Sequence, residues 1–252
     1  MIEKPPADEW YVASSGGRAI WHLTVAADAT SGEDALGEVF DIAETLRAGF
    51  ADFVMPRSLR YTPGTVPAGR SCADARRDLE TDDERTIERP DGVDRATVES
   101  LADTPDAPAG RTGCLYAVRF RDPAVTLTVD GEPVTVGPDD ERYRLVIRDE
   151  LSDRRPLYAP VTFGVTWSGP TSISDPGTPC LYDVRVTTPS PAFAWDDPDG
   201  ERNRERLGAA FDTLRADLPV ADAWLDIDEM PIGIPSVRRL AGLADARIED
   251  EF

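Results

Sequence analysis

The sequence contains almost no lysine: Lys4 is the only one among 27 lysine and arginine residues, which face 48 Asp and Glu residues. The formal net charge is −21 at pH 7. Like charges at this density repel one another in ordinary buffer, where the Debye length is about 8 Å, and are screened in molar salt, where it is about 3 Å. Loss of the long apolar lysine stems also favours a surface that competes for water and cations. The composition therefore predicts a salt-adapted protein of a high-salt cytosol, or part of a halophilic virus particle, with monovalent cations at its acidic surface.

Basic clusters and long apolar runs are also missing. No basic cluster outweighs the carboxylates around it, so we expect no direct binding of DNA or RNA. No segment approaches the roughly 18 uninterrupted apolar residues of a membrane helix, and the first residues, MIEKPPADE, do not lead into a secretion signal. Hydrophobic residues nevertheless make up 40% of the chain, which argues against a disordered acidic tail. We therefore expect a soluble globular protein that does not contact membranes.

Cysteine and histidine are too few for most kinds of site. Cys72, Cys114 and Cys180 are widely spaced and odd in number, which predicts reduced, buried thiols and neither a disulfide framework nor a metal knuckle. His22 is the only histidine, so His pairs and three-His zinc sites are excluded, and we expect it to be a packed or half-exposed strand residue. The GxSxG, GxxxxGK[ST] and GxGxxG motifs are all missing. No cofactor is therefore expected.

The patterns that are present alternate between strand and helix. Strands are predicted where β-branched and aromatic residues alternate with polar ones, and helices where apolar residues recur every three or four positions. Asp130 and Gly131 form a two-residue hairpin signal between two such strands. The expected fold is α+β, with a mainly antiparallel sheet or pair of sheets and two principal amphipathic helices. The predicted helices span 33–50 and 199–218, and the predicted strands span 18–26, 58–61, 115–121, 124–129, 142–148, 161–167, 180–186 and 223–228.

These patterns divide the chain into four regions. Residues 1–61 form a strand-helix-strand unit, and residues 62–112 form an acidic, proline-rich insertion or long loop outside the core. Residues 113–236 form a β-rich region and a second strand-helix-strand unit of the same domain, and residues 237–252 form an acidic C-terminal tail. The insertion is expected to be either a partly ordered surface segment or a lid or partner-contacting arm. Short helices are expected within it at 73–79 and after Asp91 as N-cap.

Two short sequences recur in the chain. The hexapeptide CLYAVR at 114–119 is repeated as CLYDVR at 180–185, and TLRA occurs in both predicted helices, at 45–48 and 213–216. Such recurrences predict duplicated strand-helix-strand halves. The alternative is that strand and helix patterns coincide by chance in segments this short.

Carboxylates are the only residues that suggest a metal site. Asp226 and Asp228 alternate at the end of a predicted strand, which points both side chains the same way, and Glu229 lies beside them. Oxygen ligands of this kind suit Mg²⁺ or Ca²⁺, but such pairs also arise by chance in a chain this acidic. The segment WDDPDG at 195–200 does not fit a calcium loop. With Gly200 at the sixth position, Arg206 falls at the twelfth, where a carboxylate is required.

No catalytic constellation emerges from these residues. The leading hypothesis is a non-enzymatic binding or assembly protein of an extreme halophile or its virus, acting through a protein partner or self-association. One alternative is a carboxylate-only, metal-dependent enzyme that uses Asp226, Asp228 and Glu229. Another is an accessory or immunity-type protein that binds one partner through its acidic face. Interfaces concentrate their binding energy in aromatic anchors, and the candidates outside the two helical stripes are Trp10, Tyr11, Tyr158 and Trp195.

Overall fold

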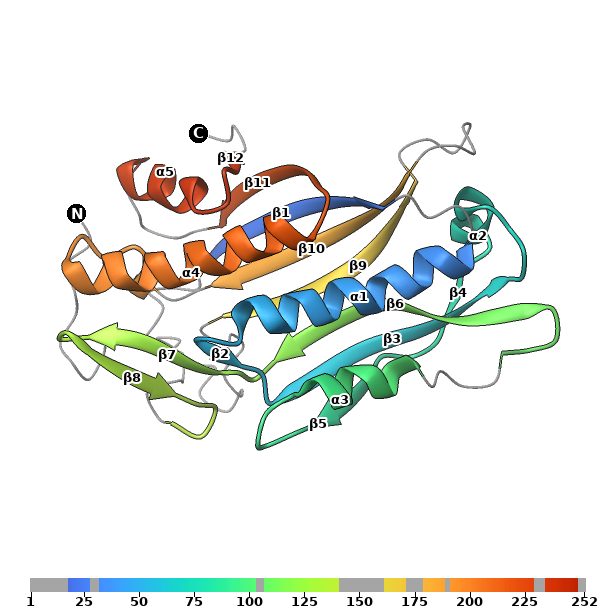
Figure 1. The fold of residues 1–252 in the computed structure, drawn as a ribbon, viewed down its shortest axis with the longest axis horizontal. Helices are drawn as coiled ribbons and strands as arrows, with labels where there is room; N and C mark the ends of the chain where they lie inside the picture. Colours follow the sequence, from blue (N-terminus) through green and yellow to red (C-terminus); the bar gives the residue numbers. More distant parts are fainter. Residues whose placement is uncertain are drawn as a thin grey trace, which may run out of the picture.

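The computed structural model describes residues 18–27, 32–102, 107–140, 161–170, 179–188, 191–228 and 234–248. The fold is α+β, as predicted, with a large and mainly antiparallel sheet that carries helices on one face (Figure 1). In the described part of the chain this sheet has nine strands, in the order β12-β11-β1-β10-β9-β6-β3-β4, with β5 paired to β3. Its strands are β1 (Arg18–Ala27), β3 (Ser58–Pro67), β4 (Glu80–Thr81), β5 (Arg85–Glu88), β6 (Arg111–Arg121), β9 (Thr162–Pro170), β10 (Cys180–Thr188), β11 (Val220–Asp228) and β12 (Arg247–Ile248).

One face of the sheet is apolar because side chains alternate along its strands. In β1, Trp21 and Leu23 are buried, whereas His22 between them points to the opposite face. The register places Leu23 beside Val184 of β10, and Val184 beside Val165 of β9. The buried rows of neighbouring strands therefore lie side by side and form one wall of the core.

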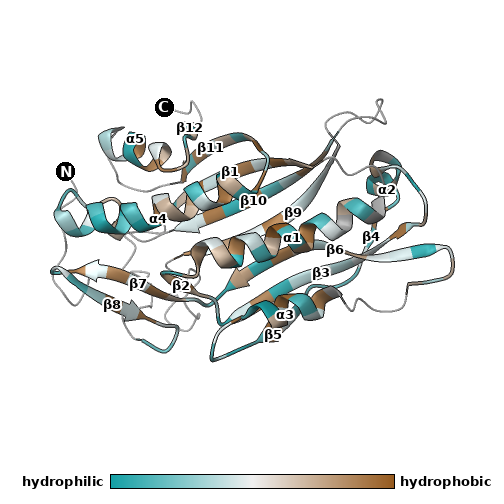
Figure 2. Cartoon of the chain, in the orientation of Figure 1, coloured by the Kyte–Doolittle hydropathy of each residue, from teal (hydrophilic) through white to brown (hydrophobic). Residues whose placement is uncertain are grey.

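The three longest helices of the described residues lie on this apolar face: α1 (Gly32–Phe50), α4 (Pro198–Asp217) and α5 (Ile234–Gly242) (Figure 1). The ring of Phe50 in α1 stacks on Phe163 in β9, with centroids 4.5 Å apart. The indole N–H of Trp21 donates to the carbonyl oxygen of Leu240 in α5 at 3.0 Å. Hydrophilic residues dominate the first half of α4, whereas hydrophobic residues are more frequent in its second half, which packs with α1 (Figure 2).

Residues 62–112 are more closely integrated into the fold than the sequence predicts. β3 continues beyond the expected strand to Pro67, and its second half pairs with β6 in the large sheet. Two short helices follow, α2 (Cys72–Arg77) and α3 (Arg95–Glu99), the latter capped by Asp94 rather than Asp91 and continued by the 3₁₀ helix η1 (Ser100–Ala102). Val93 and Val98 are buried in the core. The expectation of a segment outside the core is therefore wrong for these residues. Of the prolines that suggested a loop, Pro63 is tolerated in β3 because the strand has a register shift there.

A second, three-stranded sheet has the order β2 (Val54–Met55), β7 (Ala124–Val129) and β8 (Glu132–Val136). The predicted hairpin joins β7 to β8, and Asp130 and Gly131 have φ angles of 52° and 81°. A type I′ turn requires positive φ at both central residues, which Asp-Gly adopts readily. The hairpin signal is confirmed, but the hairpin pairs with β2 and does not extend the large sheet. The predicted strand at 142–148 lies outside the described residues.

The first turns of α4 hold this hairpin through two buried polar side chains. The carboxylate of Asp199 accepts the backbone N–H groups of Asp130 at 2.6 Å and Gly131 at 3.0 Å. The side-chain amide of Asn203, one turn later, accepts the N–H of Thr128 at 2.6 Å and donates to its carbonyl oxygen at 3.1 Å. The edge of β7 is therefore completed by a side chain instead of another strand.

Replacing Asn203 by alanine is expected to lower the free energy of unfolding by about 3 kcal/mol. Asn203 is fully buried, and its loss leaves the N–H and carbonyl of Thr128 without partners, at about 1–3 kcal/mol for each buried unsatisfied group. The measurement is urea unfolding in molar KCl. The matched control is Glu205→Ala, an exposed position on the same helix, where the change should stay within about 0.5 kcal/mol. Equal effects of the two substitutions would contradict the assigned role.

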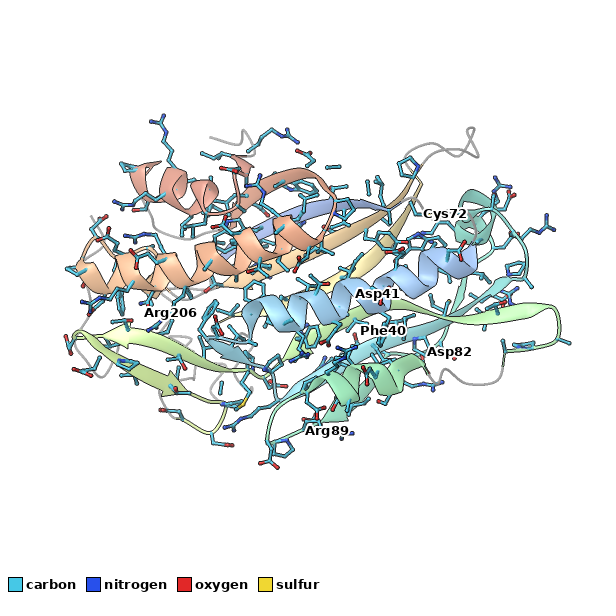
Figure 3. The ribbon with its side chains drawn as sticks, viewed as in Figure 1. Phe40, Asp41, Cys72, Asp82, Arg89 and Arg206 are labelled. Atoms are coloured by element: carbon cyan, nitrogen blue, oxygen red, sulfur yellow. A yellow bond between two sulfur atoms is a disulfide. The ribbon has the colours of Figure 1, made fainter. Side chains whose placement is uncertain are left out.

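Two of the three cysteines form a disulfide, contrary to the expectation of reduced thiols. Cys72 at the start of α2 (Figure 3) is bonded to Cys180 at the start of β10, with Cα atoms 6.5 Å apart. Cys114 is free, and burial raises the pKa of its thiol to about 12. All three side chains are buried, as predicted. An odd number of cysteines excludes complete pairing but not a single bond, and a sequence separation of 108 residues does not determine the distance in space.

Candidate anion-binding groove

The sheet face opposite α1 and α4 carries a groove of about 680 Å³. The groove is centred on β9 and bounded by β6 and β10, on the side turned away from the viewer in Figure 1. Side chains that alternate with the buried rows of these strands reach this face. On β9 they are Thr162, Gly164 and Thr166, which form the floor.

Arginine dominates the lining of the groove. Among the described residues, five arginines line it against a single carboxylate, that of Asp183, although the chain as a whole has a net charge of −21. The sequence shows no such basic cluster because these arginines come from β1, α2, β6 and β10 and are gathered only by the fold. They are Arg18, Arg76, Arg119, Arg121 and Arg185.

Two of these arginines lie on either side of one glycine. The register places Gly164 of β9 opposite Arg119 of β6 and opposite Arg185 of β10. Their Cα atoms are thus separated by two strand spacings, roughly 9 to 10 Å, so an anion above Gly164 is within reach of both guanidinium groups. A Cβ atom at position 164 would lie 2.5 Å from the carbonyl oxygen of Val118. Glycine therefore permits the close approach of β6 and β9 and leaves no side chain between the two arginines.

The ion pairs that these two arginines already make are exposed to solvent. Nη1 of Arg119 lies 3.4 Å from Oε2 of Glu84, and Nη2 of Arg185 lies 3.3 Å from Oδ2 of Asp183. The arginine side chains are 50% and 56% exposed, and exposed pairs of this kind contribute about 0 to 1 kcal/mol. Either guanidinium can exchange its carboxylate for a ligand at small cost.

Within the described part of the chain, Arg121 has a hydrogen-bond donor that is not satisfied. Its Nε atom is buried without a hydrogen-bond partner among the described residues. Burial, together with the charges of Arg60 and Arg119, lowers the pKa of Arg121 below its usual value. A buried donor without an acceptor costs about 1–3 kcal/mol. An anion in the groove would supply an acceptor and offset the crowded positive charge.

Arg76 reaches the groove from α2, on the other side of the sheet. The ladder between β6 and β9 runs from Ala117 to Phe120. Beyond it, the guanidinium of Arg76 lies over the rings of Tyr116 and Trp167, 5.5 and 5.8 Å from their centroids. The cation–π contacts fix Arg76 at one end of the groove and add a further positive charge there.

His22 borders the groove on the β1 side. Its Nδ1 lies 3.3 Å from Oδ1 of Asp183, its ring stacks on Trp224 with centroids 4.7 Å apart, and its side chain is only 12% exposed. It is therefore a packed strand residue, as expected. Burial tends to raise the pKa of Asp183, but the hydrogen bond with His22 and the charge of Arg185 outweigh it and lower that pKa. Asp183 therefore stays ionised and is shared between these two partners.

The carboxylates predicted as metal ligands are placed only in part. Asp226 is half-buried in β11 opposite Ile20, on the face of the sheet that carries the groove, and position 228 is two residues further along the same strand. The side chain of Asp228 and the whole of Glu229 lie outside the described residues. Within the described ranges, no group of three or more His, Cys, Asp or Glu side chains could hold a metal ion. The metal site therefore stays a prediction.

One of the predicted interface aromatics is not on the surface. Trp195 follows the 3₁₀ helix η3 (Pro191–Phe193) and is fully buried, although its position between predicted elements suggested exposure. Its acidic neighbours have structural partners: Asp196 pairs with Arg239, and Asp197 caps α4 by accepting the N–H of Gly200. Trp195 is therefore not available as a surface contact. The other candidates, Trp10, Tyr11 and Tyr158, lie outside the described residues.

Sequence reasoning missed the groove, yet the repeated hexapeptide contains two of its residues. CLYAVR and CLYDVR lie on β6 and β10, the two neighbours of β9, and Arg119 and Arg185 are the last residue of each copy. Both arginines face Gly164 in the same register. The duplication itself stays a prediction. The sequence signal that could have indicated this site is nevertheless present: the same hexapeptide occurs in two predicted strands, and each copy ends in arginine.

Comparison with protein families, curated proteins and solved structures finds no match for this chain. Among the described residues, no helix is both long enough and apolar enough to cross a membrane.

Proposed function

We propose that this chain is a non-enzymatic binding or assembly protein of an extremely halophilic cell or its virus, and that the groove over β9 holds a negatively charged part of its partner. The observation that carries the proposal is the concentration of five arginines in the described lining of the groove, in a chain with a net charge of −21. Partly buried cations are favourable where an anion pairs with them. A cationic groove on an acidic protein also restricts where an anionic partner can dock.

The chemistry of the groove supports recognition. Guanidinium groups and threonine hydroxyls donate hydrogen bonds to oxygen anions, and bidentate arginine contacts add geometric specificity. The one carboxylate in the described lining, Asp183, is held by His22. Contacts at hydrogen-bond distance are no longer than the Debye length of about 3 Å in molar salt, so they persist where longer-range attraction is screened.

The disulfide bond supports one of the two environments expected for this protein. Disulfides are rare in a reducing cytosol and persist on virion surfaces and in other oxidising environments. The Cys72–Cys180 bond therefore supports a halophilic virus particle more than a high-salt cytosol as the place where the protein works.

Replacing the two arginines that flank Gly164 is expected to abolish anion binding without unfolding the chain. Arg119→Gln with Arg185→Gln removes two charged donors, each of which contributes about 1.5–3 kcal/mol when bonded to an anion. The affinity for immobilised polyglutamate, polyphosphate or oligothymidylate, whichever binds the wild type, should fall by roughly 100-fold or more. Biolayer interferometry across a range of KCl concentrations measures the change.

The matched control is Arg77→Gln with Arg95→Gln. It removes the same charge from α2 and α3, where both side chains are exposed and each pairs with a carboxylate on its own helix. This variant should bind like the wild type. Equal loss in the two double variants would mean that general charge, and not the groove, governs binding; an unchanged groove variant would contradict the proposed function.

A further inference from the structure

We propose that the groove receives an extended acidic polypeptide, with carboxylates on alternate residues, that lies along β9 between β6 and β10. The proposal rests on the function proposed above and names the chemistry of the partner. The occupant is a segment of a protein, and neither a nucleic acid nor a free phosphate.

The spacing of the arginines on β6 matches an extended peptide. Arg119 and Arg121 are two residues apart on one strand, so their side chains leave the same face about 6.6 to 6.8 Å apart. Alternate side chains of an extended peptide leave its backbone at the same interval. Carboxylates at positions i and i+2 of a segment parallel to β9 therefore meet the two arginines in turn. The residue between them points away from the sheet.

Each of the two peptide carboxylates has a defined binding position in the groove. The first lies over the backbone of Gly164, between the guanidinium groups of Arg119 and Arg185, where position 164 itself contributes no side chain. The second lies over Thr162, which is opposite Thr187 of β10 in the register. There it meets two hydroxyl donors and Arg121. The unsatisfied Nε of Arg121 gains an acceptor in this arrangement.

The aromatic residues of the groove argue against a single-stranded nucleic acid. Proteins that bind single strands stack successive bases on open aromatic rings. Here, in the described part of the chain, the rings near the groove are already used: His22 and Trp224 stack on each other, and Tyr116 and Trp167 lie beneath Arg76.

The charge of β11 and the effect of salt on phosphate contacts also argue against a nucleic acid. β11 carries carboxylates on the groove face of the sheet, including Asp226, which would repel a long phosphate backbone that left the groove on that side. Phosphate contacts also weaken steeply as salt rises. A short acidic segment fits between the two flanking strands and keeps bidentate contacts with arginine.

The test is fluorescence anisotropy in molar KCl with two labelled peptides of identical composition. In one, glutamate and threonine alternate; in the other, the glutamates are contiguous. We expect the alternating peptide to bind at least tenfold more tightly than the block peptide. Arg119→Gln with Arg185→Gln should abolish this preference, whereas Arg77→Gln with Arg95→Gln should keep it. Arg119→Lys with Arg185→Lys, which keeps the charge but not the planar fork, should bind about tenfold more weakly than the wild type.

The outcomes separate this inference from the proposed function. Equal affinity for the two peptides would overturn the alternate spacing. Binding of polyphosphate or oligothymidylate, but of neither peptide, would overturn the protein partner and leave the proposed function standing. Failure of every polyanion to show binding that depends on Arg119 and Arg185 would overturn both. Near-UV dichroism of each variant confirms that it is folded before it is compared.

Discussion

Dialysis into a buffer of about 20 mM ionic strength is expected to abolish both the near-UV dichroism and the cooperative unfolding transition of this protein. The Debye length there is on the order of 20 to 30 Å, so the excess carboxylates repel one another across much of the molecule. Exposed ion pairs such as Arg95–Glu99 offset little of this, because each contributes about 0 to 1 kcal/mol. Structure should return above about 1 M KCl, where the Debye length is roughly 3 Å. A full-amplitude spectrum in the low-salt buffer would contradict the expectation.

A charge-reduced variant shows whether screening is the cause. Glu205, Asp212 and Asp217 are exposed on α4, and their replacement by the corresponding amides removes three negative charges without touching the core. The KCl concentration needed for half-recovery should fall. The same three positions changed to the opposite acid, Glu205→Asp, Asp212→Glu and Asp217→Glu, should leave it unchanged. If both variants refold at the same salt as the wild type, stabilisation by salt does not arise from these charges.

Reduction of the disulfide is expected to lower the free energy of unfolding by about 4 kcal/mol. The bond joins residues separated by 108 positions, and closing a loop of this length restricts the unfolded chain by an amount worth about 4 to 5 kcal/mol in the chain-entropy treatment. Urea unfolding in molar KCl, with and without a reductant, measures the difference. Thiol titration of the denatured, unreduced chain should give one reactive thiol, that of Cys114.

Two variants assign the effect to this bond. Cys72→Ser with Cys180→Ser should unfold at the same urea concentration in the presence and absence of reductant. Cys114→Ala should keep the full dependence on reductant, because Cys114 is not bonded. Its buried thiol, with a raised pKa of about 12, should also react slowly in the folded protein, since the thiolate is the reactive form. A wild type that is insensitive to reductant would contradict the stabilising role.

The elements of this fold could be predicted where their patterns are local. The helix expected at 33–50 is α1 (Gly32–Phe50), because apolar spacing of three and four residues is visible within the segment itself. The Asp130-Gly131 turn was identified for the same reason, since its φ angles depend on two adjacent residues. The position of the hairpin in a separate sheet was not predictable in this way. It depends on Asp199 and Asn203, which come from a helix about 70 residues later.

The candidate site is harder to predict because it depends on strand order. Arg119 and Arg185 each resemble a solvated strand residue in the sequence, and only the order β6-β9-β10 brings them to the two sides of Gly164. The same holds for Cys72 and Cys180, which meet because α2 packs against β9, the neighbour of β10 in the sheet. Pairing between distant segments follows from the packing of the whole chain, which composition and periodicity do not encode residue by residue.

The two borders of the groove contain nearly the same hexapeptide, and the one residue that differs makes the two borders unequal. Ala117 on β6 and Asp183 on β10 occupy the same place in the repeat, and both lie opposite Thr166. One border therefore presents an arginine beside a methyl group, and the other presents an arginine beside a carboxylate held by His22. For the acidic segment proposed above, the carboxylate of Asp183 would add repulsion on the β10 border that Ala117 does not add on the β6 border. The two borders are thus unequal for an acidic segment, and within the repeat the side chain of Asp183 accounts for the difference.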